Sequence, residues 1–249
     1  MKLTILGSGT AAPMQERSNA GYLLEIHDMK ILLDSGAGTI RRLLETKINL
    51  FDIENIFYTH LHNDHINDLG AIIWSNNYGL NRKKPLNIYG PQGIRKYVEI
   101  LVKKLLKPAK LYFDINTTEL RNSDFNIGNI KIKTRETIHS KNIKSIIYRV
   151  ENKKKSFVYT GDTDYCDEAI EIAKNADVLL TECSLPDNKK AEGHLTPCLA
   201  GKIAAKAKAK TLILTHFYPE VLKTDIKGKC GREFHGHIIL ARDKMKLSI

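Results

Sequence analysis

The stretch Tyr58-Thr59-His60-Leu61-His62-Asn63-Asp64-His65 decides the fold and the chemistry that the rest of the chain can support. Four side chains that bind metal ions well occupy six consecutive positions in it. An apolar run, Ile53 to Tyr58, leads into them and predicts a buried strand. A lone histidine at a strand end is usually a satisfied polar residue, but packing alone seldom gathers three histidines and an aspartate. The stretch therefore predicts a metal site at the mouth of a strand.

The spacing of these ligands favours two metal ions over one. In an extended chain His60 and His62 project to the same side, so they can share an ion. Asp64 and His65 are adjacent and open a helix predicted over Asp64 to Tyr78, so their side chains diverge. At most one of them can easily join the first ion. We therefore expect a second ion close to the first.

Length and composition indicate one large domain, residues 1–249, with a substantial core. The chain is 42% hydrophobic and has no linker-like Pro/Gly/Ser tract. No run approaches the ~18 apolar residues of a membrane span, and the first strand is too short for a signal peptide. Four widely spaced cysteines without a CxxC pair are typical of a reducing compartment. We therefore expect a cytoplasmic protein.

The net charge of +11 permits an anionic partner such as RNA. Lysine runs at 103–104, 153–155 and 202–210 carry much of it, and no aromatic residues interleave them. Lysines that only solvate exposed helix faces would give the same pattern. The composition leaves both interpretations open.

The first strand, Lys2 to Leu6, ends in a glycine turn, residues 7–13, that superficially matches a dinucleotide-binding fingerprint. A strand from Gly21 to Ile26 follows at once and leaves no room for the crossover helix, so this interpretation is rejected. With Met29 to Asp34 that strand predicts a hairpin turning at His27-Asp28. Asp34 could orient nearby metal ligands or cap the helix predicted over Thr39 to Thr46.

Three further potential ligands stand where an apolar strand stops. His139 follows the predicted strand over 130–138, Asp162 follows that over 156–159, and His216 follows that over 211–214. Loops at one rim of a sheet are where sites are built on a rigid scaffold. With the histidine cluster these residues complete a set of seven ligands for two ions, and Asp162 could bridge both ions through its two oxygens.

Strands alternate with amphipathic helices along the remaining chain. Helices are predicted over 93–106, 167–175 and 197–209, and strands over 86–89, 111–115, 145–151, 178–181 and 238–240. Leu105 is expected on the inward face of the first of these helices. The pattern favours an α+β protein with two sheets face to face and helices outside.

This constellation resembles the metallo-β-lactamase superfamily over nearly the whole chain. The matching stretches are Leu33-Asp34, the HxHxDH motif of residues 60–65, His139, Gly161-Asp162-Thr163 and Thr215-His216. The resemblance implies a four-layer αββα sandwich, the metallo-β-lactamase fold, and a metal-dependent hydrolase. It implies one ion on His60, His62 and His139, a second on Asp64, His65 and His216, and Asp162 shared. Two zinc ions suit these nitrogen-rich ligands, and manganese or iron could replace zinc.

Within the superfamily the chain is most similar to the ribonuclease Z branch and its phosphodiesterase relatives. The glycine turn with Arg17, Glu182-Cys183 and Gly193-His194-Leu195-Thr196 carry this likeness. It implies that His194, oriented by Glu182, donates a proton or stabilises charge at the scissile phosphate, and that Asp64 aligns the nucleophile. Alternatively, Thr196 caps the next helix and His194 is a bystander. Homodimers are common in this branch, so a homodimer is also expected.

The chain departs from the tRNA-processing enzymes of this branch in one place. Those enzymes usually carry a long Gly/Pro-rich arm between the segments that match His139 and Asp162, and here only twenty-two residues lie between them. This favours a smaller phosphodiester, such as a cyclic nucleotide, or RNA bound through another surface. The alternatives are a hydrolase of a thioester, lactone or sulfate ester on the same fold, and a non-catalytic RNA-binding protein.

Overall fold

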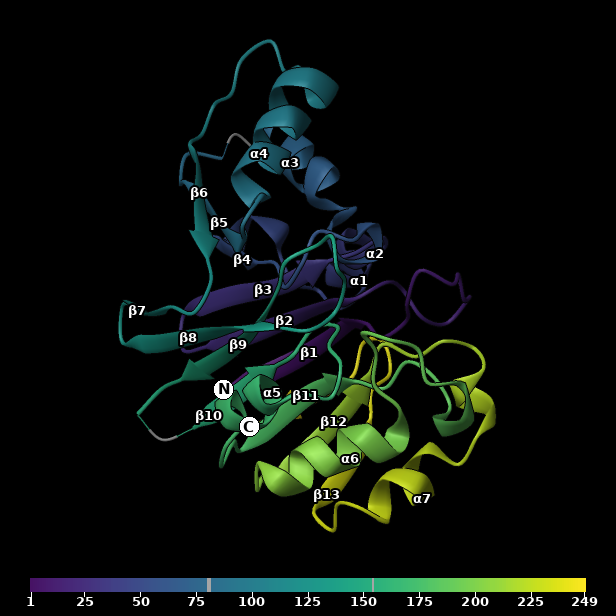
Figure 1. Cartoon of the computed structure of the whole chain (residues 1–249). Helices are drawn as coiled ribbons and strands as arrows, with labels where there is room; N and C mark the ends of the chain where they lie inside the picture. The colour runs from purple at the N-terminus through teal and green to yellow at the C-terminus, as the bar shows by residue number, and fades with distance from the viewer. Residues whose placement is uncertain (80–81, 154) are drawn as a thin grey trace.

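The computed structural model describes residues 1–79, 82–153 and 155–249; Lys154, part of the predicted lysine run at 153–155, lies outside the described residues. Two seven-stranded mixed sheets face each other, and helices cover the outer side of each (Figure 1). The four layers confirm the predicted αββα sandwich and the α+β class.

The first sheet runs in the order β14-β1-β2-β3-β4-β5-β6. Its strands are β1 (Lys2–Gly7), β2 (Gly21–Ile26), β3 (Met29–Ser35), β4 (Asn55–Phe57), β5 (Leu86–Pro91), β6 (Ile115–Leu120) and β14 (Lys246–Ser248). Strand β1 pairs antiparallel with β2, which excludes a dinucleotide-binding crossover here, as predicted. Strands β2 and β3 form the predicted hairpin, and β3 to β6 are parallel.

The second sheet runs in the order β13-β12-β11-β10-β9-β8-β7. Its strands are β7 (Asp124–Ile127), β8 (Ile130–Thr137), β9 (Ser145–Glu151), β10 (Ser156–Tyr159), β11 (Val178–Glu182), β12 (Thr211–Thr215) and β13 (His237–Leu240). Because β9 is antiparallel to both neighbours, β8 and β10 run in one direction, and β10 to β13 are parallel. The carboxyl ends of β8, β10, β11 and β12 therefore meet at one end of the sheet.

Helices cover the two outer faces (Figure 1). On the first sheet lie α1 (Thr39–Glu45), α2 (Asn63–Ile66), α3 (Leu69–Tyr78) and α4 (Ile94–Ile100), which continues into the π-helical turn η2 (Leu101–Leu106). On the second lie α5 (Asp167–Ile172), α6 (Pro197–Lys206) and α7 (Ile226–Gly231). Short 3-10 turns are η1 (Leu50–Asp52), η3 (Asp187–Lys189) and η4 (Val221–Lys223). Over the described residues, every helix is too short or too polar to cross a membrane.

Apolar side chains pack on both faces of the strands, which explains why the strands read as continuous apolar runs. In β3, Ile31 and Leu33 belong to the core between the sheets, whereas Leu32 points outward to the core beneath α1 to α4. This is the alternation that a pleated strand requires. The sandwich thus holds each strand rigidly and leaves the loops at its rim to carry chemistry.

Three predicted elements differ from the structure. The helix predicted over Asp64 to Tyr78 breaks between α2 and α3, where Asp68 bonds to a neighbouring segment: its N–H donates to Ser35 O (2.9 Å) and its carboxylate accepts from Ile40 N (3.0 Å). The strand predicted over 111–115 begins only at Ile115, because the Asn77 side chain ties down residues 110–112. The π-helical turn rotates Leu105 outward, where it is 70% exposed.

Candidate metal centre

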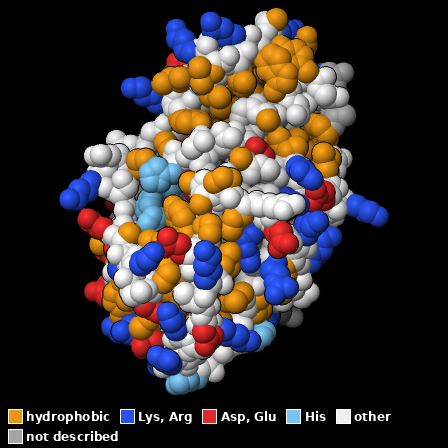
Figure 2. Space-filling model, turned by 90° about the vertical axis from the view of Figure 1, so that its right-hand side faces the viewer, with side chains coloured by type: hydrophobic (Ala, Val, Ile, Leu, Met, Phe, Trp, Pro, Cys, Tyr) orange, Lys and Arg blue, Asp and Glu red, His pale blue; other side chains and the backbone are white. Residues whose placement is uncertain are grey.

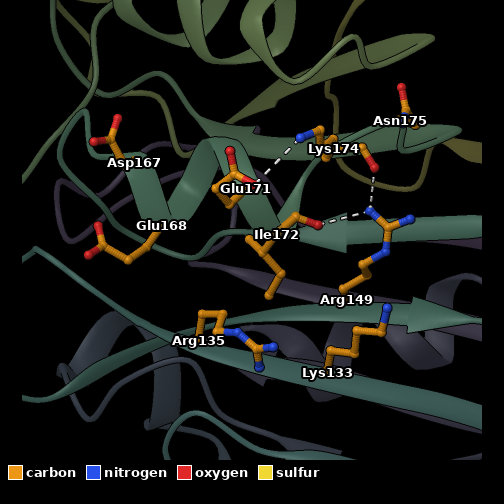
Figure 3. Close-up of a pocket in the computed structure, with 9 residues that line it drawn as sticks. All are labelled: Lys133, Arg135, Arg149, Asp167, Glu168, Glu171, Ile172, Lys174 and Asn175. Carbon is orange, nitrogen blue, oxygen red and sulfur yellow. Dashed lines mark hydrogen bonds and ion pairs between the residues drawn. The ribbon is translucent and has the colours of Figure 1, made fainter.

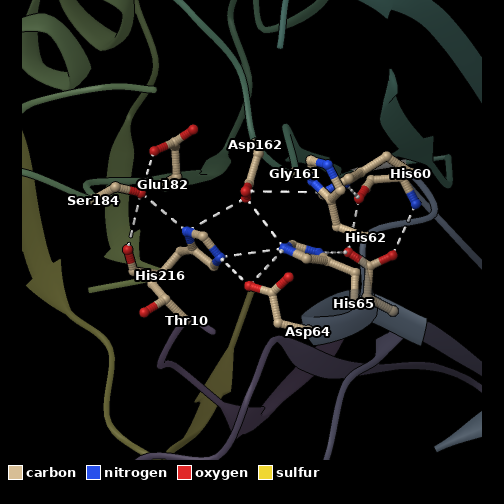
Figure 4. A network of polar contacts seen from close by, with 12 residues as sticks. Thr10, His60, His62, Asp64, His65, Gly161, Asp162, Glu182, Ser184 and His216 are labelled. Carbon is tan, nitrogen blue, oxygen red and sulfur yellow. Dashed lines mark hydrogen bonds and ion pairs between the residues drawn. The ribbon is translucent and has the colours of Figure 1, made fainter. Parts of the chain in front are cut away.

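Seven side chains that could bind cations converge where strands of both sheets end, and Figure 4 labels all of them except His139. From the first sheet come His60 and His62, in the loop after β4, with Asp64 and His65 on α2. From the second come His139, Asp162 and His216, which follow β8, β10 and β12. The structure thus brings all seven predicted ligands to one rim. Figure 2 shows histidine side chains gathered on this face, and His62 and His139 are partly exposed.

The cluster contains two triads that share a carboxylate. Potential ligand atoms of His60, His62 and His139 lie within 4.8 Å of one another, as do those of Asp64, His65 and His216. In the first triad His62 Nδ1 lies 3.0 Å from His139 Nε2. In the second His65 Nε2 lies 3.2 Å from His216 Nε2, and His216 Nε2 lies 3.3 Å from Asp64 Oδ2. Ring nitrogens that face each other so closely are typical of ligands aimed at one cation.

Asp162 lies between the triads and presents one oxygen to each. Its Oδ1 is 3.3 Å from His65 Nε2, and its Oδ2 is 3.9 Å from His139 Nε2 and 4.0 Å from His60 Nε2. Among the described residues, Asp162 Oδ1 and His60 Nε2 are buried without a hydrogen-bond partner. Leaving such atoms unsatisfied costs about 1–3 kcal/mol each, unless a cation binds there. These two unpartnered atoms are therefore suited to coordinate divalent metal ions.

Hydrogen bonds on the far side of each ring fix which nitrogen is free. His65 Nδ1 donates to Asp34 Oδ2 (2.8 Å), His139 Nδ1 donates to Gly193 O (2.9 Å), and His60 Nδ1 lies 3.0 Å from Thr59 Oγ1. A proton on Nδ1 leaves Nε2 with its lone pair directed into the cluster. These three histidines can therefore act as ligands through Nε2.

Asp34 orients the cluster from behind. Its Oδ2 accepts hydrogen bonds from His65, the Thr59 hydroxyl (2.8 Å) and the Tyr159 hydroxyl (2.7 Å), and its Oδ1 accepts from Thr59 N (2.8 Å). The N-cap residue of α1 is Gly38, and the carboxylate that accepts from the first turn of α1 is Asp68 (from Ile40 N, 3.0 Å), so the alternative role of Asp34 as a helix cap is wrong. Asp34 and His216 both adopt φ in the left-handed region, a strain that clusters at functional sites.

Glu182, at the end of β11, pairs with His194 beside the triads. Each carboxylate oxygen lies 3.2 Å from His194 Nδ1, which is 3.9 Å from Asp162 Oδ2. Burial lowers the pKa of the His194 imidazole, but the carboxylates of Glu182, Asp162 and Asp64 together outweigh burial and raise that pKa to about 9. The hydroxyl of Thr196 accepts from Leu199 N (3.4 Å) and caps α6, so capping does not require His194.

Sequence reasoning missed Ser184, which joins the Glu182–His194 pair to the ligands. Its hydroxyl donates to Glu182 Oε2 and lies 3.0 Å from His216 Nδ1, which leaves His216 Nε2 free for a cation. Burial raises the pKa of Asp64, but the neighbouring His216 and His65 imidazoles together outweigh burial and lower that pKa to about 2. The Glu-x-Ser spacing at a strand end was the available signal for Ser184, because alternate residues share a face.

Two hollows differ in their chemistry. One of about 400 Å³ opens beside the triads and is lined by His62, His139, Ser140, Lys141 and Glu192. A larger one of about 590 Å³ lies between α5 and the strands β8 and β9 (Figure 3). Arg149, a basic side chain that lines it, is already bonded within the protein, because it donates to Ile172 O (2.9 Å) and Lys174 O (2.8 Å). Only the smaller hollow touches potential metal ligands, so we place the functional site there.

Comparison with known proteins finds similar proteins over the whole chain. Ribonuclease Z of Borrelia recurrentis is 31% identical over 306 aligned residues, which cover 98% of this chain and 96% of that protein. The structure of human tRNase Z, short form, is 27% identical with a TM-score of 0.83, and the match covers 100% of this chain and 99% of that one. The metallo-β-lactamase fold protein YhfI of Bacillus subtilis has a TM-score of 0.86 at 24% identity, over 99% and 98% of the two chains.

The fold and the donor set, with these relatives, define a metal-dependent phosphodiester hydrolase of the metallo-β-lactamase superfamily, in its ribonuclease Z-like branch. The predicted superfamily, branch and enzyme class are thereby confirmed. A protein-family model assigns the chain to one family within this class. The chain belongs to the family described as anti-Pycsar protein Apyc1, whose model matches residues 1–235.

Proposed function

We infer that residues 1–249 act as one cytoplasmic hydrolase domain that cleaves a small phosphodiester, such as a cyclic nucleotide, with two zinc ions. The observation that carries this inference is the Glu182–His194 pair, whose imidazole is 3.9 Å from Asp162. Strands β9 and β10 take up half of the twenty-two residues between His139 and Asp162, and the remainder leaves no length for an arm that would bind tRNA. The hollow beside the triads, about 400 Å³, suits a single nucleotide better than a folded RNA.

The ligand assignment follows the two triads. We assign His60, His62 and His139 to one ion, Asp64, His65 and His216 to the other, and Asp162 to both. Five imidazoles and two carboxylates without a thiolate suit zinc, with manganese and iron as the competing metals. When bound, such cations lower the pKa of water toward neutrality and offset the negative charge of a phosphodiester.

The protein's own groups then align and protonate the reactants. Asp64, whose pKa is about 2, stays ionised at neutral pH and can accept a hydrogen bond from the attacking water. His194 keeps its Nδ1 on Glu182, so its Nε2–H is free to donate toward the substrate. As water adds to phosphorus and one P–O ester bond breaks, His194 supplies the proton that the leaving oxygen needs. Glu182 favours the charged imidazole that can make this transfer.

A substrate panel tests the proposed function. The protein, loaded with zinc or with manganese, is assayed on bis(p-nitrophenyl) phosphate, cyclic nucleotides, a 3′-extended pre-tRNA and a thioester. We expect turnover of the first two, and its loss in a His65→Ala variant whose metal content falls. Turnover of the thioester alone would overturn the assignment to phosphodiesters. Salt-sensitive RNA binding without turnover would favour a non-catalytic RNA-binding protein.

We also infer a homodimer that forms through the helical face of the first sheet. Large hydrophobic side chains are exposed on α3 and η2: Trp74 is 44% exposed, Tyr78 48% and Leu105 70%. The rings of Trp74 and Tyr78 pack against each other with centroids 4.5 Å apart and planes tilted by 53°, so they present one apolar surface. A Trp74→Glu variant should shift sedimentation from dimer to monomer. A monomeric parent protein at micromolar concentration would contradict this inference.

A further inference from the structure

Tyr218 lies beside the metal centre, and the roles assigned so far do not explain it. Its ring centroid lies 6.4 Å from that of His194 and 6.3 Å from that of His216, and its plane is nearly perpendicular to both, at 82° and 89°. The two imidazoles are almost parallel, at 14°, with centroids 6.2 Å apart. The tyrosine therefore flanks both the proposed proton donor and a proposed metal ligand.

The backbone holds this tyrosine in place on two sides. Phe217 N donates to Ser8 O (3.1 Å), and Tyr218 N donates to Ser184 O (3.2 Å). The Phe217 side chain is fully buried, and a proline follows Tyr218 in the sequence. A side chain carried on so constrained a segment is pre-organised, so a ligand that binds it loses little ordering entropy.

The hydroxyl of Tyr218 is the feature that points to a ligand. The fully buried tyrosines use theirs within the protein: Tyr159 donates to Asp34 (2.7 Å) and Tyr148 donates to Tyr58 O (2.9 Å). Within the described part of the chain, the Tyr218 hydroxyl makes no hydrogen bond, although the ring is half-buried beside the centre. Its ring lies edge-on to the imidazoles of the proposed proton donor His194 and the proposed ligand His216, so the side chain stands beside the groups that would contact a substrate.

We propose that Tyr218 is a positioning residue whose hydroxyl donates a hydrogen bond to a non-bridging oxygen of the phosphodiester. This rests on the proposed function, because the phosphodiester supplies the acceptor that the protein lacks. The diester anion carries its charge before the reaction as well as in the transition state. The hydroxyl should therefore bind both states about equally, which lowers KM and leaves kcat almost unchanged.

The test compares Tyr218→Phe with the parent protein, both loaded with zinc. A hydrogen bond to an anionic oxygen corresponds to about a tenfold effect or more. We expect KM for bis(p-nitrophenyl) phosphate to rise at least about tenfold while kcat stays within a factor of about two. The dissociation constant of inorganic phosphate, measured by calorimetry, should rise by the same factor. Metal content and Tm should not change, because the hydroxyl has no protein partner to lose.

The matched control is Tyr89→Phe, which removes the hydroxyl of another half-buried tyrosine whose ring stacks on Phe57 at 4.5 Å. It should behave as the parent protein in every measurement. Unchanged KM and phosphate affinity in Tyr218→Phe, or loss of metal from it, would overturn the proposal. If the parent protein hydrolyses no phosphodiester, the proposed function fails, and the phosphate titration alone then decides the role of Tyr218.

Discussion

Replacing Asp34 with asparagine should weaken cation binding although Asp34 touches no cation. Three donors converge on its Oδ2: the Thr59 hydroxyl, His65 Nδ1 and the Tyr159 hydroxyl, all within 2.8 Å. An asparagine has the same shape, but one of its two oxygens is replaced by an NH₂ group, which cannot accept a hydrogen bond. If the NH₂ takes the place of Oδ2 it faces the three donors, and if it takes the place of Oδ1 the bond from Thr59 N is lost. His65 can accept from that NH₂ only by moving its own proton to Nε2, which then no longer has a lone pair for a cation.

The expected magnitude follows from this change of tautomer. Loss of a hydrogen bond that orients a ligating histidine typically costs 10- to 100-fold in metal affinity, or about 1.4 to 2.8 kcal/mol. We expect that loss for the triad of Asp64, His65 and His216, and a smaller one for the triad of His60, His62 and His139, which Asp34 reaches only through Thr59. Dialysis against graded chelator, followed by elemental analysis, would measure both sites.

A second buried carboxylate provides the control. Asp68 accepts a hydrogen bond from Ile40 N (3.0 Å), and burial raises its pKa, but among the described residues it bonds to none of the histidines. Asp68→Asn should therefore retain both cations. If Asp34→Asn also retained both with the affinity of the parent protein, the Asp34 bond would not fix the His65 tautomer, and the reasoning would be wrong.

Three further predictions test other contacts. Replacing His194 with alanine should leave metal content unchanged and lower kcat about 100-fold or more, as expected for loss of a general acid; equal turnover in a metal-replete variant would remove it from the mechanism. Arg149→Ala should lower the free energy of unfolding in urea by about 2 kcal/mol, because two carbonyls near the end of α5 lose their donor (Figure 3). Gly193→Ala should reduce metal affinity in chelator competition, because φ is +80° and the added Cβ would lie 1.9 Å from His139 O. An alanine variant that binds metal normally would show that the loop adapts.

The sequence indicates which of these side chains gather at the rim because the pattern that marks them is local. Each ligand is a residue type with few structural reasons to stand at the end of an apolar strand, and the parallel strands gather those ends at one rim. What it missed depends on contacts between distant segments. The break before α3 arises from Asp68 bonding to Ile40 and Ser35, and no pattern within residues 64–78 encodes those partners.

The residues that support the cluster were harder to predict for the same reason. Ser184 is an ordinary serine until the fold sets it between Glu182 and His216, and Tyr159 reads as a core residue until its hydroxyl reaches Asp34. The outward rotation of Leu105 likewise follows from a π-helical turn that a period of 3.6 residues does not describe. Periodicity identifies faces, and only the folded chain identifies the partners of single polar atoms.

Both sheets supply potential ligands to the same rim. Residues 60–65 follow a strand of the first sheet, and His139, Asp162 and His216 follow strands of the second. Metal ions bound there would link the two sheets at one end of the sandwich only. Amide hydrogens near that end should then exchange more slowly in metal-loaded than in chelator-treated protein, while those at the opposite end exchange equally in both. Metal binding would thereby make the end of the domain that carries the ligands more resistant to local unfolding than the opposite end.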